Sequence, residues 1–344
     1  MILVLHGAKA NAGDFLIRDR GLAILRHLLP GQELAVHPRW ERVDEALFDE
    51  ADAVVLCGGP GLAPSFYPRV FPLVRRLEEH STPVLPLALG WSGVFASRPD
   101  RFFTERSVRA LREIHSRIGW SGVRDDLSLA LLESIAVGEV RRTGCVAWYD
   151  LDSLGQPFPS PAAIKRVIFT PPAKRRAGGL RETVALLRVL RARYREAERL
   201  CVFHRGMRKR KEVAAETSTA ERRATAAAAR ALGFGVVDAS GESDFVDSYR
   251  EADLHVGYRV HAHLAMLSFR RPTLLVAEDG RGEGQAVTLH DPHRLRAGAP
   301  GLAESLDAAL AREEGSGFAA TARAIEEIEA TWPVMRATVE QLPR

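Results

Sequence analysis

Short apolar runs alternate with amphipathic stretches along almost the whole chain. In the first half, the runs that predict strands fall at 2–7, 33–38, 52–59 and 83–90. Helical patterns lie between them, including about 14–29 and the stretch FYPRVFPLVRRLEEH at 66–80. Because these runs are apolar throughout, they are typical of parallel strands covered by helices on both faces. The first half therefore predicts a doubly wound α/β domain.

A Pro-rich segment, LGQPFPSPAAIK at 154–165, interrupts this alternation and predicts a linker. The alternation then restarts, with strand-like runs at 166–172, 200–204, 234–240 and 272–279. We therefore expect one domain at 1–155, a second at 165–315, and a helical segment at 316–344 that returns toward the first domain. Two doubly wound domains place a ligand cleft between the carboxyl ends of their sheets.

Composition narrows the class of protein. The chain has 344 residues, 46% hydrophobic and 27% charged, which is ordinary for a globular protein. Its apolar runs fall short of the roughly 18–20 residues that span a bilayer, and its start lacks the basic segment of a signal peptide. Three cysteines at unrelated spacings predict neither a disulfide framework nor a metal site. We expect a cytoplasmic protein without a bound metal.

The charge balance is close to even, with 48 basic and 44 acidic residues and a net charge of +4. The densest basic cluster, HRGMRKRK at 204–211, has no interleaved aromatic residues. A solvated surface explains it better than nucleic-acid binding does. Contact with an anionic membrane face or an anionic substrate stays open.

The most informative stretch is GYRVHAHLAML, which places Arg259 and His261 at the start of a predicted helix. A helix N-terminus attracts anions, an arginine adds a bidentate grip, and a histidine can transfer protons. Arg281 follows the next predicted strand, so we expect it on the same sheet edge. Together these residues predict a site for chemistry on a phosphate or carboxylate.

Other cations also follow strands of the second half. Lys174 and Arg175 come after its first strand, and Arg205 comes after its second. Doubly wound domains bind anions at this edge, although ordinary surface charge also accounts for each residue.

Two loops of the first half would face this edge. Asn11 and Asp14 follow the first strand, and Asp14 is placed to cap a helix. Gly58 and Gly59 follow the third strand, where glycine lets the backbone approach an oxyanion or a sugar hydroxyl. A capped turn without ligand is the alternative for the first loop. The glycine spacing HGAKANAG does not fit a dinucleotide site.

Two further features bear on the first half. Trp91, Phe66 and Tyr67 are aromatic residues available to stack on a sugar. The segment Arg124-Asp125-x-x-Ser128 opens a predicted helix, and we interpret it first as a cap with an ion pair.

Taken together, these motifs resemble the polysaccharide pyruvyl transferase family from the first strand to about residue 285. The shared motifs, in order, are Asn11–Asp14, the glycine turn at 58–61, Arg124-Asp125 with Ser128, Gly144-Cys145, and Gly257–His261 with Arg281 downstream. The chain departs from the family pattern at Pro60, Val260 and Arg281, where the family has Gly, Leu and Lys. An arginine in place of lysine keeps the charge but changes the geometry of a phosphate contact.

The resemblance implies a GT-B-like pair of Rossmann-like domains. It implies phosphoenolpyruvate as donor substrate in the second domain and a sugar-containing acceptor in the first, with no further cofactor. On this basis the catalytic residues are His261, Arg259 and Arg281; the donor-binding residues are Arg175, Lys174, Arg205 and Gly257; and the acceptor-binding residues are Asn11, Asp14, Gly58, Gly59 and Trp91. The pyruvyl group would pass to acceptor hydroxyls, and a second hydroxyl could close a ketal.

Two other functions stay open. The same fold would suit a GT-B glycosyltransferase that uses a nucleotide sugar, with Glu278 as a candidate ribose-binding carboxylate. A protein that binds a sugar or an anion without turnover is the third reading. The sequence does not identify the acceptor, whether it is lipid-linked, or the oligomeric state.

Overall fold

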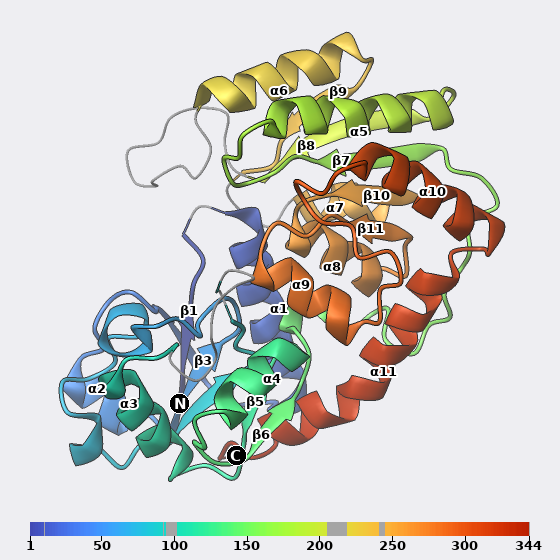
Figure 1. Ribbon diagram of the computed structural model, residues 1–344. Helices are drawn as coiled ribbons and strands as arrows, with labels where there is room; N and C mark the ends of the chain where they lie inside the picture. Colours follow the sequence, from blue (N-terminus) through green and yellow to red (C-terminus); the bar gives the residue numbers. More distant parts are fainter. Residues whose placement is uncertain (10, 92, 94–101, 205–218, 241–244, 344) are drawn as a thin grey trace.

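The chain folds into two α/β bodies that meet along one face and are bridged by the C-terminal helix (Figure 1). This computed structural model describes residues 1–9, 11–91, 93, 102–204, 219–240 and 245–343. Each body is built on a parallel sheet, as the uniformly apolar runs of the sequence predict. The prediction of two doubly wound domains is confirmed.

The first body contains a four-stranded parallel sheet in the order β2-β1-β3-β4. Its strands are β1 (Ile2–His6), β2 (Leu34–Pro38), β3 (Ala53–Cys57) and β4 (Val84–Leu87). Its helices are α1 (Ala12–Leu28), α2 (Glu45–Glu50), α3 (Glu105–His115) and α4 (Asp126–Glu133). The short pair β5 (Ser121–Val123) and β6 (Val140–Arg142) extends the sheet beyond β4. Strands β1, β3 and β4 are buried throughout, whereas the edge strand β2 is partly exposed.

One predicted helix of this body is wrong. The stretch at 66–80 forms only a five-residue turn at Phe66–Val70 and a single 3-10 turn at Leu77–Glu79. Pro68 and Pro72 explain this, because proline removes a backbone donor and clashes with the preceding helical turn. The apolar side chains of the stretch pack into the core without helical backbone.

The second body contains a five-stranded parallel sheet in the order β11-β10-β7-β8-β9. Its strands are β7 (Arg166–Thr170), β8 (Glu198–Phe203), β9 (Gly235–Asp238), β10 (Leu254–Gly257) and β11 (Thr273–Leu275). Its helices are α5 (Gly179–Arg193), α6 (Thr219–Ala231), α7 (Phe245–Arg250), α8 (Val260–Ser268), α9 (Gly280–Thr288) and α10 (Leu302–Gly315).

The last helix, α11 (Ala319–Val339), runs from the second body back to the first, as predicted (Figure 1). It contacts α1, β5 and β6. The Trp120 indole donates to Thr338 Oγ1 at 2.9 Å, and Arg142 forms an ion pair with Glu327 at 2.5 Å. These contacts hold the C-terminal helix on the first body.

The two bodies also share a hydrophobic core. One cluster of buried side chains continues from the first sheet through α1 to α8 and α11; it includes Val4, Ile17, Val146, Met266 and Ile328. Direct hydrogen bonds join the bodies as well, from Trp148 Nε1 to Gln285 Oε1 and from the Asp126 amide to Thr288 Oγ1, both 2.8 Å. This packing fixes the loops at the two sheet edges opposite one another.

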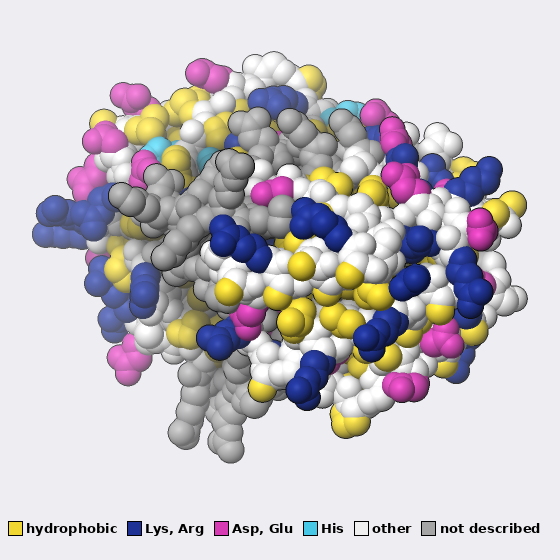
Figure 2. Space-filling view, turned by 90° about the horizontal axis from the view of Figure 1, so that it is seen from above, with side chains coloured by type: hydrophobic (Ala, Val, Ile, Leu, Met, Phe, Trp, Pro, Cys, Tyr) yellow, Lys and Arg dark blue, Asp and Glu magenta, His cyan; other side chains and the backbone are white. Residues whose placement is uncertain are grey.

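None of the helices in the described part of the chain is long and apolar enough to cross a membrane. Figure 2 looks down on the face of the second body that carries α5 and α6. Lys and Arg side chains on the described part of this face are separated by neutral and hydrophobic atoms. This pattern does not give a nucleic acid a continuous basic stripe. Apart from His204, the basic cluster at 204–211 lies outside the described residues.

Candidate active site

The candidate site lies where the carboxyl end of β10 meets the loop after β1. Arg259 is the N-cap residue of α8, and Asn11 is the N-cap residue of α1. Gly257 makes the approach of the two strand ends β7 and β10 possible, because its φ is +155° and an added Cβ would lie 2.4 Å from the Thr170 carbonyl oxygen. Gly257 was predicted to bind the donor; in the structure it allows the ends of β7 and β10 to approach each other beneath the site.

Direct contacts cross from one body to the other at this point. Arg259 Nη2 donates to Asn11 Oδ1 at 2.8 Å, and both residues are buried. The Ala12 amide donates to the His204 carbonyl oxygen at 3.3 Å. A Cβ added to Gly13 would lie 2.0 Å from His261 Nδ1, so glycine lets the imidazole reach the start of α1. The structure therefore brings Asn11, Arg259 and His261 together.

The electrostatics of His261 set it apart from an ordinary histidine. Burial lowers its pKa well below 6.5, and the positive charges of Arg259, Arg281 and Arg124 lower it further. The imidazole is therefore neutral at neutral pH in this state. A bound anion would oppose the three guanidinium groups and raise the pKa of His261 again.

Asp279 holds two of the predicted cations. It caps α9, where its carboxylate accepts from the Arg281 amide at 2.9 Å. Arg281 Nη2 and Lys174 Nζ each lie 2.6 Å from Asp279 Oδ2. Burial of Asp279 would raise its pKa, but the hydrogen bonds and charges of Arg281 and Lys174 lower it overall. Asp279 is not among the residues predicted for the site, although its position before Arg281 at the start of a helix is typical of an N-cap.

Glu278 ties together two loops of the second body. Its two carboxylate oxygens accept from the backbone amides of Ala173 at 3.0 Å and Lys174 at 3.1 Å. Burial raises the pKa of Glu278. This carboxylate thus fixes the loop after β7, which carries Lys174, beside the loop after β11.

The Arg124-Asp125-x-x-Ser128 segment has more than the capping role that the sequence suggested. Asp125 caps α4 and accepts from Ser128 Oγ at 2.6 Å. Arg124 is buried, lies 2.8 Å from Asp125 Oδ2, and donates to the Trp91 carbonyl oxygen at 2.7 Å. Because its charge also lowers the pKa of His261, Arg124 is a further cation of the site.

Asp14 lies between the two bodies. Burial raises its pKa, while the charges of Arg39, Arg281 and Arg259 and a hydrogen bond with Asn11 oppose this effect. The sequence predicted that Asp14 caps α1 with its side chain. This prediction is wrong, because Asp14 is the third residue of that helix. Its carboxylate lies instead where charges of both bodies act on it, those of Arg39 on one side and of Arg259 and Arg281 on the other.

The predicted glycine turn adopts the backbone conformation that glycine favours. Gly58 has φ +58° and Gly59 has φ +77°, and a Cβ at Gly58 would lie 2.7 Å from Ile17. Both glycines follow β3, at the same sheet edge as Asn11.

Of the three aromatic residues predicted as available to stack on a sugar, Phe66 and Tyr67 are not placed to do so. Phe66 and Tyr67 are buried in the first body, and the Tyr67 hydroxyl donates to the Val74 carbonyl oxygen at 2.7 Å, so the prediction of stacking is wrong for both. Trp91 is half-buried where the bodies meet, and a Cβ at Gly280 would lie 2.7 Å from its ring.

One predicted donor-binding cation, Arg175, does not join the cluster. The side chain of Arg175 is 74% exposed and forms an ion pair with Glu221 at 3.3 Å, so the adjacent Lys174, and not Arg175, reaches Asp279. Arg205 lies outside the described residues.

Comparison with known proteins decides the family. The sequence profile of the polysaccharide pyruvyl transferase family matches residues 11–280, more than half of the chain. The chain belongs to this family. A comparison with curated proteins gives no match.

Solved structures with a similar fold are distant in sequence. The UDP-GlcNAc 2-epimerase from Neisseria meningitidis bound to UDP-GlcNAc is 12% identical, with a TM-score of 0.55, and the match covers 98% of this chain and 99% of that one. The S. aureus MnaA–UDP co-structure is 11% identical, with a TM-score of 0.53 and coverage of 94% and 90%. At such identities these likenesses show the fold alone, a GT-B-like pair of domains.

As a member of the polysaccharide pyruvyl transferase family, the protein is a transferase that modifies polysaccharides. A sugar-containing acceptor follows from the family. The family match also ends at Gly280, so Arg281, in the first turn of α9, comes directly after the matched region.

Proposed function

We propose that this transferase moves the pyruvyl group of phosphoenolpyruvate onto hydroxyls of a sugar-containing acceptor in polysaccharide or glycoconjugate biosynthesis. The single observation that carries the proposal is a buried, neutral imidazole surrounded by three guanidinium groups, those of Arg259, Arg281 and Arg124. Phosphoenolpyruvate carries a phosphate and a carboxylate, and arginine binds both in a bidentate manner. The donor would therefore place two anionic groups among the guanidinium groups that act on His261.

Donor binding would also prepare His261 for acid catalysis. A neutral imidazole cannot donate the proton that the enol methylene needs, but a bound anion raises its pKa. The proton then passes from His261 to C3 of phosphoenolpyruvate, and C2 gains oxocarbenium character. The guanidinium groups stabilise the phosphate as it leaves.

The acceptor would approach from the first body. One acceptor hydroxyl attacks C2, its proton passes to the Asp14 carboxylate, and the C2–O bond to phosphate breaks. Loss of phosphate leaves C2 as an oxocarbenium centre again. A second acceptor hydroxyl attacks it and closes a pyruvate ketal, and the proton of this hydroxyl passes to the departing phosphate, which is released as inorganic phosphate. The raised pKa of Asp14 makes its carboxylate a stronger base toward the acceptor hydroxyl.

The position of Glu278 favours this function over a nucleotide-sugar transferase. Glu278 was the candidate ribose-binding carboxylate, but both of its oxygens accept from backbone amides of the loop after β7. These hydrogen bonds give Glu278 a structural role, and they occupy part of its capacity to accept from ribose hydroxyls.

A phosphate-release assay tests the proposal. We expect release of inorganic phosphate from phosphoenolpyruvate only when a suitable saccharide from a panel is present. We also expect phosphoenolpyruvate, and not UDP- or GDP-sugars, to raise the melting temperature, because a ligand that binds only the folded state stabilises it. Stabilisation by nucleotide sugars alone would favour the glycosyltransferase.

A further inference from the structure

A second group of polar and aromatic side chains lies at the edge of the first sheet, where β1 and β2 end beside each other. His6 pairs with Pro38 in the strand register, and the Arg39 amide donates to the His6 carbonyl oxygen at 2.9 Å. This hydrogen bond places the loop that begins at Gly7 next to Arg39 and Trp40. None of these residues belongs to the motifs that identify the family.

Arg39 lies in space that two glycines leave open. A Cβ at Gly7 would be 3.1 Å from Arg39 Cζ, and a Cβ at Gly59 would be 3.7 Å from Arg39 Nη1. The guanidinium lies 5.5 Å from the centroid of the Phe71 ring. Its Nη1 is buried without a hydrogen-bond partner among the described residues. A buried donor without an acceptor is unfavourable, so an anion or a water that supplies the acceptor would stabilise this arrangement.

Trp40 and Lys9 extend this group toward solvent. Trp40 is 37% exposed, which is unusual for a large aromatic side chain in the described part of this chain. Lys9 Nζ lies 5.4 Å from the Trp40 ring centroid, and the His6 ring meets the indole edge-on at 6.2 Å. An exposed indole beside a cation offers a flat apolar face for a sugar ring and a charge for an anionic substituent.

We propose that Lys9, Arg39 and Trp40 form an acceptor-anion subsite, which selects saccharides that carry a phosphate or a carboxylate. Arg39 and Lys9 bind the negative group, and Trp40 stacks on the sugar ring. The inference rests on the proposed function, because it defines the class of acceptor for the same cleft.

Asp14 connects the subsite to the donor side. Its carboxylate is close enough to Arg39 on one side, and to Arg281 and Arg259 on the other, for all three charges to act on it. A saccharide anchored by its anionic group at Arg39 would therefore present its hydroxyls toward Asp14. This arrangement fits the transfer of a proton from the attacking hydroxyl to Asp14.

Binding of small saccharides in the absence of phosphoenolpyruvate tests the subsite. The probes are N-acetylglucosamine 1-phosphate, glucuronic acid and neutral N-acetylglucosamine, titrated by saturation-transfer NMR. We expect the full-length protein to bind at least one charged probe about tenfold more tightly than the neutral sugar, because hydrogen bonds to charged groups are the stronger ones. The two charged probes distinguish a phosphate from a carboxylate. Equal affinity for all three would overturn the proposal.

The variants locate the effect. Arg39→Gln should abolish the preference for charged probes, and Arg39→Lys should keep part of it. Trp40→Ala should lower the affinity for all three probes. Arg42→Gln, at an exposed position on the same loop, is the matched control and should bind like the wild type. An unchanged preference in folded Arg39→Gln would contradict the proposal. Should that variant fail to fold, a double variant of the exposed pair, Lys9→Gln with Trp40→Ala, must lose the preference.

The experiment separates this inference from the proposed donor. Charged probes bind without phosphoenolpyruvate, so their binding does not depend on the donor site. Arg39→Gln could lose the preference while the wild type releases no phosphate from phosphoenolpyruvate. This result would support the subsite and contradict the assignment of phosphoenolpyruvate as donor. Phosphate release with only neutral acceptors would contradict the subsite and support the donor.

Discussion

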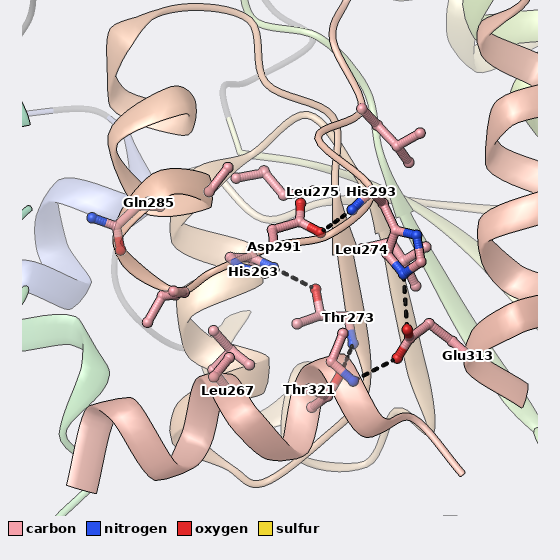
Figure 3. A pocket seen from close by; sticks show the side chains of 15 residues that line it. His263, Leu267, Thr273, Leu274, Leu275, Gln285, Asp291, His293, Glu313 and Thr321 are labelled. Carbon is pink, nitrogen blue, oxygen red and sulfur yellow. Dashed lines mark hydrogen bonds and ion pairs between the residues drawn. The ribbon is translucent and has the colours of Figure 1, made fainter. Parts of the chain in front are cut away.

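Two regions of the second body gather histidines and charged groups, and they do so in opposite ways. One is the candidate active site around His261. The other is a polar cluster formed by His263, Thr273, Asp291, His293 and Glu313, which lines a cavity of about 30 Å³ between α8, α9, α11 and β11 (Figure 3). His261 and His263 lie two residues apart on the same helix, yet the His261 ring lies against Gly13 at the start of α1 and His263 lines this cavity.

The polar cluster is closed by its own hydrogen bonds. His293 Nε2 lies 2.8 Å from Glu313 Oε1, and Glu313 Oε2 accepts from the Ala320 amide at 3.1 Å (Figure 3). His263 Nδ1 lies 3.0 Å from Thr273 Oγ1. The remaining space holds about one water molecule. These groups satisfy each other, so the cluster stabilises the fold.

The active site is charged rather than closed. Three of its cations, Arg259, Arg281 and Arg124, act together on one imidazole and suppress the charge of His261. A buried titratable group therefore points to a ligand when several like charges act on it at once, and to folding when its hydrogen-bonding partners complete each other.

Separate substitutions of the two histidines on α8 should show the largest difference between the two regions. His261→Ala should fold and lose transfer by about 10²- to 10⁴-fold, because it removes the proton donor. The matched control, His263→Gln, should keep the rate of transfer. Phosphate release from phosphoenolpyruvate with an active acceptor measures both. Wild-type turnover by purified His261→Ala would refute the assignment.

A change in the polar cluster should affect stability instead. Glu313→Ala leaves the His293 ring and the Ala320 amide without their acceptor, so the free energy of unfolding should fall by about 1–3 kcal/mol. Denaturant titration measures this loss. The affinity for phosphoenolpyruvate, determined by calorimetry on the folded variant, should stay that of the wild type. A weaker affinity would mean that the cluster also shapes the donor site.

A smaller effect should follow from Arg281→Lys, which installs the residue that the family pattern carries. The charge stays, but the two-point contact of the guanidinium with Asp279 is lost. We expect the KM for phosphoenolpyruvate to change by roughly threefold to tenfold, with little change in kcat. Arg312→Lys, at an exposed position on α10, controls for the substitution itself. A collapse of kcat would show that Arg281 acts in the chemical step.

The pH dependence of stability should be the mildest effect. Burial lowers the pKa of four histidines of the second body, namely His204, His255, His261 and His263, the last to about 3. In the unfolded chain these rings take up protons below about pH 6.5, which the folded state resists, so stability is lost as the pH falls through this value. The raised pKa values of Asp14 and Glu278 act in the opposite direction but involve fewer groups.

Denaturant titrations at pH 7.5 and pH 5.5 check this expectation. The free energy of unfolding should be lower at pH 5.5, and His261→Gln should reduce the difference. Equal stability at the two values would indicate that these rings take up protons in the folded state.

Much of the fold follows from the sequence because buried parallel strands leave an unmistakable apolar signature. The strands at both sheet centres and the returning helix α11 are predicted correctly. The failure at 66–80 has a local cause, since helical periodicity does not weigh the two prolines inside the pattern.

The candidate site is less predictable, because a sequence shows which residues follow a strand but not where their side chains point. Strand ends correctly placed Arg259, His261 and Arg281 at one edge. Nothing local distinguishes Lys174, which reaches Asp279, from its neighbour Arg175, which turns to the surface. The subsite at Arg39 depends on space left by glycines from two different loops, and such space appears only in three dimensions.

Calorimetric titration of phosphoenolpyruvate into the wild type and into Arg259→Gln tests whether the cations around His261 bind the donor. We expect one donor molecule per chain, bound with uptake of a proton by His261, which appears as a binding enthalpy that depends on the buffer. In Arg259→Gln the affinity should fall by about tenfold or more, since a charged hydrogen-bonding partner of the anion is lost. Absence of phosphoenolpyruvate binding to the wild type, or unchanged affinity in the folded variant, would contradict the account.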